Sequence, residues 1–574
     1  MSSLRVPGLG PIVGHTTAST CRIWIRAGDP LDKGADLAAP RRTLGVIAVC
    51  EEDGTPVNAP EVYYFRLHRE FDRTGTFNLG EEIGIARDWT PGTQAKLRLK
   101  AGTRYTVVVG TLTLDDPFPD DENVPDDELA ARLPESSVWR EDLQKLRDRD
   151  EDRCTATFTT FPDTGNDTAE AMSFIVGSCR YPGLLWKTKE ADRIFGPLCS
   201  EALGLVEGAD GAPRRPAEFV IMVGDQIYAD MLNRHVPIKL ADTFEEFQER
   251  YLTAFGSPNM KTLLSRVPTY MILDDHEIED NWTQDRVRKM ESRRVFNLAI
   301  GAYMSYQWSH SPRTYGRRLY YKLECGGYPF FVLDARTQRY VDDVENSLDD
   351  NHLLGRPALP GEDPGQLDLL LHWLKELQSN RGNIPKFIVT SSVFAPNPMS
   401  ARTGRKGKNA QKVAWMEDSD SWPAFPKTRG AILECILENK VQNVVFLSGD
   451  IHCSNVAEIS FDGTAAARKL KAFSITSSAF YWPFPFADGE PSHYVHDSAH
   501  PDQLDSFKFA GKYEMNYKAW NFTQEDNYCR VDVDRPNAEL RVRTFDNKGR
   551  LIVRKNWLTG QETPLETDLR LADW

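Results

Sequence analysis

The sequence contains no run of about 18 consecutive apolar residues, so no segment is expected to cross a bilayer as a helix. It also lacks a basic excess, because 84 acidic residues outnumber 69 Lys and Arg residues and give a formal net charge of −15. Nucleic acids and anionic membranes select basic surfaces, so neither is an expected partner. A small phosphorylated substrate is still compatible with this charge if it enters a locally positive site.

Cysteine patterns and export signals are missing as well. The nine cysteines are odd in number and form no CxxC pair, which argues against a disulfide framework and against a zinc ribbon. The N-terminal stretch MSSLRVPGLGPIVGHTT has no charged segment followed by a long apolar one, and we interpret PRRTLGVIAVC as a strand. These features predict a cytoplasmic protein. The motifs GxSxG, P-loop and HExxH are also absent, so serine hydrolases, NTPases and zincins lack support.

A length of 574 residues exceeds what one hydrophobic core usually supports, so two domains are expected. Residues 1–165 alternate apolar and polar positions in short segments separated by turns, which predicts an all-β sandwich of the fibronectin or immunoglobulin type. The expected strands are TCRIWIRAG, LGVIAVCEE, VYYFRLHRE, AKLRLKAG, RYTVVVGTLTL and CTATFTTFP. An acidic insertion over residues 114–152 is expected to be a solvated excursion with one helix.

Residues 166–574 read as a second domain of the α/β class, because short apolar runs alternate with helical stretches. The runs are SFIVGSC, FVIMVGDQ, TYMILDDHE, FFVLDAR, FIVTSS and VVFLSGDIH, and each ends in polar or ionisable residues. Functional groups gather at the carboxyl ends of strands in such folds, so these six ends predict one shared cleft. From about Lys471 the strand-like pattern returns and is expected to complete a second sheet.

The strand ends deliver carboxylates, an amide, imidazoles, a phenol and a thiol, from Cys179, Asp225, Tyr228, Asp275, His276, Asn281, Asp450 and His452. Such a mixed set is typical of sites for several metal ions. Phenolate and thiolate ligands favour iron, whereas Asp and Asn oxygens suit Ca²⁺, Mg²⁺ or Mn²⁺. Bound cations would also offset the repulsion among the carboxylates of MILDDHEIEDNW.

The blocks GSC, GDQIYAD, DDHEIEDNW and LSGDIH, in this order and spacing, resemble the PhoD-like alkaline phosphatases of the calcineurin-like metallophosphoesterase superfamily. The stretch GPIVGHTTASTCRIWIRAGD resembles the β-sandwich that precedes their catalytic domain. The resemblance covers most of the chain and implies an αββα metallophosphoesterase sandwich that hydrolyses phosphate monoesters, diesters or both. It implies Fe³⁺ with one or two Ca²⁺ ions; the alternative is Mn²⁺, Mg²⁺, Co²⁺ or Zn²⁺ in a binuclear site.

The resemblance also implies roles for single residues, and the seven implied metal ligands are Cys179, Asp225, Tyr228, Asp275, Asn281, Asp450 and His452. Cys179 and Tyr228 would bind the iron, and Asp225 would bridge it to a neighbouring ion. Metals in this set would activate a water molecule for attack on phosphorus. By analogy with purple acid phosphatases, His276 would protonate the leaving group.

Several other residues leave two interpretations open. Arg180 would grip a phosphate oxygen or serve in a plain ion pair, and Arg336 and Arg339 would contact substrate or form structural ion pairs. Asp274 and Glu277 would orient ligands. The basic loop over residues 402–412 is a solvated loop or an electrostatic lid, and SAFYWPFPFAD is a packed loop or a contact for an apolar leaving group.

An alternative function is a non-catalytic metal-binding module whose N-terminal sandwich recognises a partner. The intact His276 and the complete ligand set disfavour it. Members of the family are often exported, and the lack of a recognisable export signal here sets this chain apart from them. The oligomeric state and the physiological substrate are not readable from the sequence.

Overall fold

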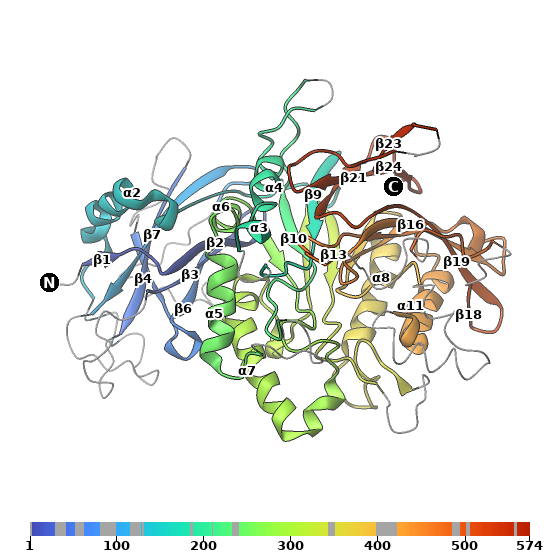
Figure 1. Cartoon of the computed structure of the whole chain (residues 1–574), viewed down its shortest axis with the longest axis horizontal. Helices are drawn as coiled ribbons and strands as arrows, with labels where there is room; N and C mark the ends of the chain where they lie inside the picture. The colour runs from blue at the N-terminus through green and yellow to red at the C-terminus, as the bar shows by residue number, and fades with distance from the viewer. Residues whose placement is uncertain are drawn as a thin grey trace.

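The computed structural model describes residues 3–574 except for residues 29–41, 52–61, 81–98, 115–127, 129–130, 132, 184–187, 209–210, 232–239, 342–349, 398–421, 485–493, 501–505 and 556–558. Figure 1 shows a group of N-terminal strands beside a larger body of mixed sheets and helices. The mixed α/β class predicted from the sequence is confirmed.

Two antiparallel sheets make up the N-terminal part. One sheet holds β1 (Leu4–Arg5), β7 (Arg104–Thr113), β4 (Thr43–Glu51), β5 (Val62–Arg66) and β8 (Thr155–Thr159). The other holds β2 (Leu9–Thr16), β3 (Cys21–Arg26) and β6 (Thr74–Leu79). Ile23, Ile47 and Val107 belong to one apolar core built from both sheets. Five of the six predicted strands are present; of the sixth, residues 95–98 lie outside the described residues and residues 99–102 form no strand.

The acidic insertion contributes helix α2 (Arg140–Cys154), which is less solvated than the sequence predicts. Leu143 and Leu146 are buried and pack with Tyr64 and Leu112 on the outer face of the first sheet. Residues three apart share one face of a helix, so two leucines suffice to make an apolar stripe in a strongly charged segment. The charged composition hides this stripe. Residues 115–127 of the insertion are outside the described residues.

The larger body contains a six-stranded and an eight-stranded sheet. The six-stranded sheet has the order β11 (Thr269–Met271), β10 (Phe219–Met222), β9 (Ala171–Gly177), β20 (Asn527–Asp534), β21 (Glu539–Asp546) and β24 (Glu566–Arg570). The eight-stranded sheet has the order β12 (Tyr321–Cys325), β13 (Tyr328–Val332), β14 (Lys386–Val389), β15 (Val444–Ser448), β17 (Ala472–Thr476), β16 (Ser454–Asp462), β19 (Tyr513–Thr523) and β18 (Phe507–Phe509).

The six predicted apolar runs are β9, β10 and β11 of one sheet and β13, β14 and β15 of the other. Each set of three runs parallel. Two of the predicted C-terminal strands, RVDVDRP and AELRVRTF, correspond to β20 and β21, which extend the six-stranded sheet next to β9. The predicted strand LIVRKNW is represented by β22 (Val553–Lys555), which pairs with β23 (Glu562–Pro564).

The two large sheets pack against each other through their inner faces. Phe174 of one sheet lies edge-on to Phe387 of the other at 5.3 Å between ring centroids, and Phe387 stacks on Phe330 at 4.5 Å. Helices α4 (Phe195–Ala202), α5 (Phe244–Phe255), α6 (Pro258–Leu264) and α7 (Met290–Tyr306) share a core with the six-stranded sheet. Helices α8 (Gln366–Arg381) and α11 (Pro426–Glu438) share one with the eight-stranded sheet. The short helix α3 (Thr188–Asp192) precedes α4.

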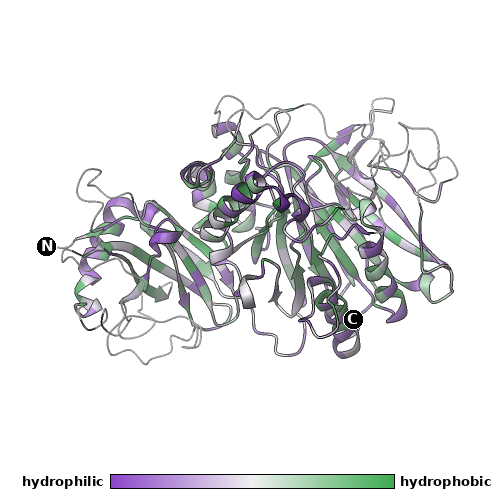
Figure 2. Ribbon diagram, turned by 90° about the horizontal axis from the view of Figure 1, so that it is seen from below, coloured by the Kyte–Doolittle hydropathy of each residue, from purple (hydrophilic) through white to green (hydrophobic). Residues whose placement is uncertain are grey.

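This layering explains the unbroken apolar runs of the central strands. A strand that is covered on both faces has no solvent side, so it carries apolar residues at successive positions. Figure 2 shows these strands as mostly hydrophobic, whereas the helices carry both classes of residue. In the part of the chain that the structure describes, no helix combines the length and the apolar character needed to cross a membrane.

The N-terminal sheets are tied to the carboxyl end of α7. The indole Nε1 of Trp24 donates to the carbonyl oxygen of Ser305 at 2.9 Å. Next to it, Asp72 accepts from the hydroxyl of Tyr306 and pairs with Arg26, with 2.6 Å between Oδ2 and Nε. These groups are buried, so the contact joins the two parts firmly. The domain boundary at residues 165 and 166 stays a prediction.

If α2 is part of the N-terminal core, Leu143→Ala should destabilise the protein by about 2–5 kcal/mol, because it leaves a cavity beside the sheet. Leu143 is 1% exposed, whereas Val138 in the same insertion is 57% exposed. The control variant Val138→Ala should therefore change stability by less than about 0.5 kcal/mol. Urea unfolding followed by circular dichroism measures both, and equal midpoints for the two variants would contradict the packing of α2.

Candidate metal centre

Ligand side chains from both large sheets meet at the carboxyl ends of the parallel strands. Cys179 follows β9, Asp225 follows β10, Asp275 follows β11 and Asp450 follows β15. Three groups have potential ligand atoms within 4.8 Å of one another: Cys179, Asp225 and His452; Asp225, Asp275 and His276; and Asp274, Asp275 and Asp450. Asp225 and Asp275 each belong to two groups, so the three groups form one continuous cluster. The shared cleft expected from the six strand ends is thus built from at least four of them.

One end of the cluster brings a thiol, a phenol and an imidazole around one carboxylate. The Cys179 thiol donates to Asp225 Oδ2 at 3.4 Å, and the Tyr228 hydroxyl donates to the same oxygen at 3.3 Å. His452 Nε2 lies 3.3 Å from the Tyr228 hydroxyl oxygen. Burial lowers the pKa of His452 to about 3, so its ring is neutral and offers a lone pair. The four groups converge on one small volume.

Several predicted ligands sit in an unusual backbone conformation. Positive φ angles occur at Cys179 (57°), Asp225 (57°), Asn281 (55°), Asp450 (75°) and His452 (51°). A residue with a Cβ atom pays roughly 1–2 kcal/mol for the left-handed region, and such conformations cluster at functional sites. Five of the seven predicted ligands share this feature, so the strand-end turns that present them are under common backbone strain.

The turn GDQIY depends on its glycine. Gly224 has φ +107°, and a Cβ atom there would lie 2.5 Å from the Cβ of Asp274. Only glycine permits both the angle and this close approach of the β10 and β11 ends. The sharp turn predicted at the end of β10 is present, and it brings Asp225 toward the second strand end.

Electrostatics favour a cation in this cluster. Burial raises the pKa of Asp225 and of Asp450 well above the usual range, and neighbouring carboxylates add to the shift. Burial likewise raises the pKa of the Cys179 thiol and the Tyr228 phenol. Asp225 Oδ1 is buried and accepts no hydrogen bond from the described residues. A bound metal ion would both supply this oxygen with a partner and stabilise the anionic forms, so the residues present fit metal ions.

Glu277 holds two strand-end loops together. Its carboxylate accepts from the backbone N–H groups of Gln226 at 2.7 Å, Asp274 at 2.9 Å and Asp225 at 3.2 Å. The side chain of Gln307, just after α7, donates to it at 3.3 Å. A buried carboxylate with these donors fixes the backbone on either side of two predicted ligands. Glu277 therefore has a geometry that suits the predicted orienting role, but it contacts the main chain of the two loops and not the side chains of the predicted ligands.

Arg336 offsets part of the negative charge. It is completely buried, pairs with Asp274, and places Nη2 3.5 Å from Asp275 Oδ1 and 3.6 Å from Asp450 Oδ1. Although burial opposes it, the charges of Arg336 and His276 lower the pKa of Asp275. Of the two interpretations of Arg336, the ion pair is present in the structure, and contact with substrate stays a prediction.

His276 is paired with Asp230, a carboxylate for which the sequence predicts no role. His276 Nδ1 lies 2.8 Å from Asp230 Oδ1, and Asp230 Oδ2 accepts from the N–H of Asp280 at 2.7 Å. Burial works against the charged ring, but Asp230, Asp275 and Asp225 raise the pKa of His276 well above its usual value. Asp230 ends the block GDQIYAD, and its distance of 46 residues from His276 leaves no local signal for this pairing.

The remaining predicted residues lie at the margin of the cluster. Arg180 Nη2 donates to Ser257 Oγ at 2.8 Å, and its guanidinium lies over the ring of Phe195. Its role toward substrate stays a prediction. The backbone N–H of Asn281 donates to Asp275 Oδ2 at 2.6 Å, while the Asn281 side chain is exposed. The basic loop 402–412 lies outside the described residues.

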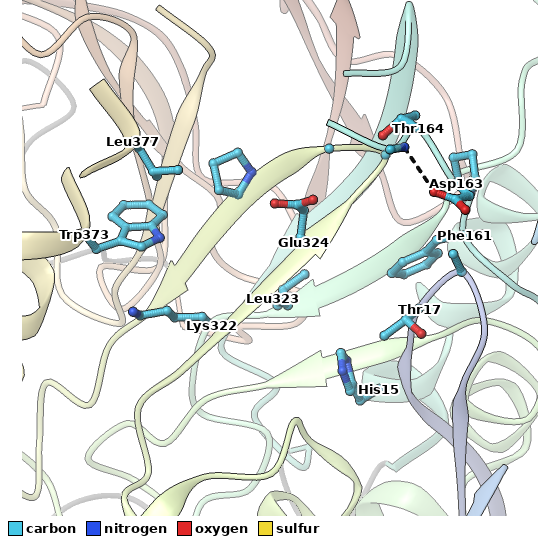
Figure 3. A pocket seen from close by; sticks show the side chains of 16 residues that line it. His15, Thr17, Phe161, Asp163, Thr164, Lys322, Leu323, Glu324, Trp373 and Leu377 are labelled. Atoms are coloured by element: carbon cyan, nitrogen blue, oxygen red, sulfur yellow. Dashed lines mark hydrogen bonds between the residues drawn. The ribbon is translucent and has the colours of Figure 1, made fainter. Parts of the chain in front are cut away.

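A separate cavity of about 500 Å³ has no part in this cluster. Figure 3 shows it between the N-terminal strands and the hairpin of β12 and β13, with His15, Phe161, Lys322 and Trp373 on its walls. The hairpin turn precedes β13, so the cavity lies at the amino end of that strand. The metal-binding candidates follow the carboxyl ends, at the opposite edge of the sheets.

Comparison with known proteins gives one consistent result. The model of the family "PhoD-like phosphatase" matches residues 204–533, more than half of the chain. Alkaline phosphatase D of Bacillus subtilis (strain 168) is 25% identical over 270 residues, which span 44% of this chain and 44% of that protein. A solved structure described as "Structure of PhoD" superposes with a TM-score of 0.59 at 16% identity, over 94% of this chain and 86% of that one.

Glu277→Gln should weaken metal binding about 10- to 100-fold, as expected when a partner that orients ligands is lost. The amide would present N–H groups to backbone N–H donors and would loosen both loops. Elemental analysis after dialysis against graded metal concentrations measures the effect. Glu279→Gln is the matched control, because Glu279 is partly exposed and 3.9 Å from Arg286. Equal metal content in the two variants would remove the orienting role.

Proposed function

Because the chain belongs to the PhoD-like phosphatase family, we propose that it is a metal-dependent phosphoesterase that hydrolyses phosphate monoesters, diesters or both. The observation that carries the proposal is the cluster of Cys179, Asp225, Asp275, Asp450 and His452 at the strand ends of two sheets. The two packed sheets, with helices sharing a core with each outer face, support the αββα arrangement expected for a metallophosphoesterase.

The thiol, phenol and imidazole end of the cluster suits the iron. Cys179, Tyr228 and His452 would hold it, and Asp225, which contacts both the thiol and the phenol, would bridge to the neighbouring ion. The oxygen-rich end, with Asp275, Asn281 and Asp450, would hold one or two Ca²⁺ ions, or another divalent ion in a binuclear site. When bound, these ions supply Lewis acidity that activates water and neutralises charge on the phosphoryl oxygens.

His276 would act as the proton donor to the leaving group. Its Nδ1 is engaged by Asp230 at 2.8 Å, so Nε2 is the nitrogen that can serve the substrate. Asp230 also accepts from the Asp280 backbone, and this second contact fixes the carboxylate and hence the plane of the imidazole. Asp230 is a positioning residue in this scheme. Arg180 and Arg336 are candidate phosphate contacts.

Removal of metal ions should abolish hydrolysis. Purified protein should hydrolyse p-nitrophenyl phosphate, bis-p-nitrophenyl phosphate or both, and chelation followed by dialysis should remove this activity until metal is restored. Ferric iron bound by phenolate or thiolate gives a visible charge-transfer band, which Tyr228→Phe should shift or bleach and Tyr321→Phe, a change on β12, should retain. Full activity after chelation would contradict the proposal, and a metal-loaded protein that hydrolyses neither ester would favour the non-catalytic metal-binding module.

His276→Gln should lower kcat about 10²- to 10⁴-fold for an alkyl phosphate, the range expected from loss of a general acid. The loss should be smaller for p-nitrophenyl phosphate, because p-nitrophenolate leaves without protonation. Asp230→Asn should reproduce this leaving-group dependence with a smaller loss and unchanged metal content. A uniform loss across leaving groups in both variants would contradict the proton-donor role.

A further inference from the structure

An aromatic cluster borders the thiol and phenol end of the metal centre. It consists of Tyr181, Trp482 and Phe484, and we call it the aromatic wall. Tyr181 packs edge-on against Trp482 at 5.6 Å and against Phe484 at 5.4 Å, and Trp482 lies 4.9 Å from Phe484. Trp482 and Phe484 are only partly buried, so the wall has an accessible side.

The wall is continuous with the predicted metal ligands. Trp482 stacks face to face on His452, with 3.5 Å between ring centroids and 8° between planes. Tyr181 packs edge-on against Tyr228 at 5.3 Å. Two of its three rings therefore touch residues that would hold the iron, so a phosphate ester bound at the metals lies within reach of the wall.

The wall is linked to the proposed proton donor through Tyr228. The ring of His276 lies 4.3 Å from that of Tyr228, on which Tyr181 packs. Burial raises the pKa of Tyr181, and Asp230, the partner of His276, adds to the shift. A leaving group departs toward its proton donor, so a wall that reaches His276 through the single ring of Tyr228 is close to the part of the substrate that would leave.

The wall is held in place before substrate binds. The backbone N–H of Tyr181 donates to the carbonyl oxygen of Tyr481 at 3.1 Å and joins the two loops that carry the rings. The backbone N–H of Trp482 donates to Asp526 Oδ1 at 3.1 Å, and the Tyr481 hydroxyl donates to Glu190 at 2.9 Å. Pre-ordered rings lose little entropy when a ligand stacks on them.

We propose that the aromatic wall is a subsite for a planar aromatic leaving group, which makes aryl phosphate esters the preferred substrate class. The inference rests on the proposed phosphoesterase function and deepens it. Trp482 and Phe484 are the partly exposed rings, and Tyr181 packs edge-on against both. Trp482 stacks directly on His452. An aryl ring joined directly to the phosphate oxygen is therefore the group that would reach the wall from a phosphate bound at the metals.

The test compares two inhibitors that differ in one ring, phenylphosphonate and methylphosphonate, by calorimetry on the metal-loaded protein. Phenylphosphonate should bind about 3- to 10-fold more tightly than methylphosphonate, because one aromatic contact adds to the affinity of the shared phosphonate group. Phe484→Ala should abolish this preference and leave methylphosphonate binding unchanged. Phe484→Tyr, which keeps the ring, should retain it.

Phe507→Ala is the matched control, since Phe507 is a half-buried phenylalanine on β18 at the far edge of the eight-stranded sheet and should keep the preference. Equal affinities of the two phosphonates in the unaltered protein, or an unchanged preference in Phe484→Ala, would overturn the subsite while hydrolysis of phosphate esters left the phosphoesterase standing. Absence of both hydrolysis and phosphonate binding would refute the proposed function itself.

Discussion

The structure is organised around buried negative charge. Asp225, Asp274, Asp275 and Asp450 belong to overlapping groups of close carboxylates where two sheets meet, and all but Asp450 are buried. Carboxylates in such a place are stable only when each charge has a compensating partner. Arg336 compensates one part of the cluster through Asp274 and its neighbours. No Arg or Lys of the described residues pairs with Asp225, whose cationic neighbour is the ring of His276, and this is where the soft and aromatic ligands converge.

The arginine and the proposed metal ions would therefore have different roles. The guanidinium is covalently fixed and holds the strand ends even without metal, so the cluster need not be assembled by ions from an unfolded loop. Metal ions would then bind where the backbone already adopts the left-handed conformation, at Cys179, Asp225 and Asp450. Glu277 contributes in the same way, because it pins main-chain N–H groups of two loops. The site is pre-formed by the protein, and the proposed ions would complete it.

The strand ends could be predicted because the signal is local. An apolar run followed directly by GDQ, DDH or SGD indicates both a strand and the polar residues at its carboxyl end within a few positions. The contacts of Glu277 with the loop after β10 and of His276 with Asp230 could not be predicted, since these partners lie about 50 residues away and are backbone N–H groups or a carboxylate with no motif of its own. Arg336 reaches Asp274 from the other sheet, so its ion pair depends on how the sheets pack. The burial of α2 was missed because two leucines are hard to see among fifteen mostly charged residues.

The hydrogen bond from Gln307 to Glu277 has a wider consequence. Gln307 directly follows α7, and the last turn of that helix is hydrogen-bonded to Trp24 of β3 and to Asp72 in the loop before β6. The N-terminal sheets therefore support, through α7 and Gln307, the Glu277 carboxylate that holds the loops of the candidate metal centre. A shortened chain limited to the family-matched residues 204–533 would lose this support from the N-terminal sheets, together with Cys179 and the whole of β9. The family-matched region alone therefore lacks part of the candidate metal centre.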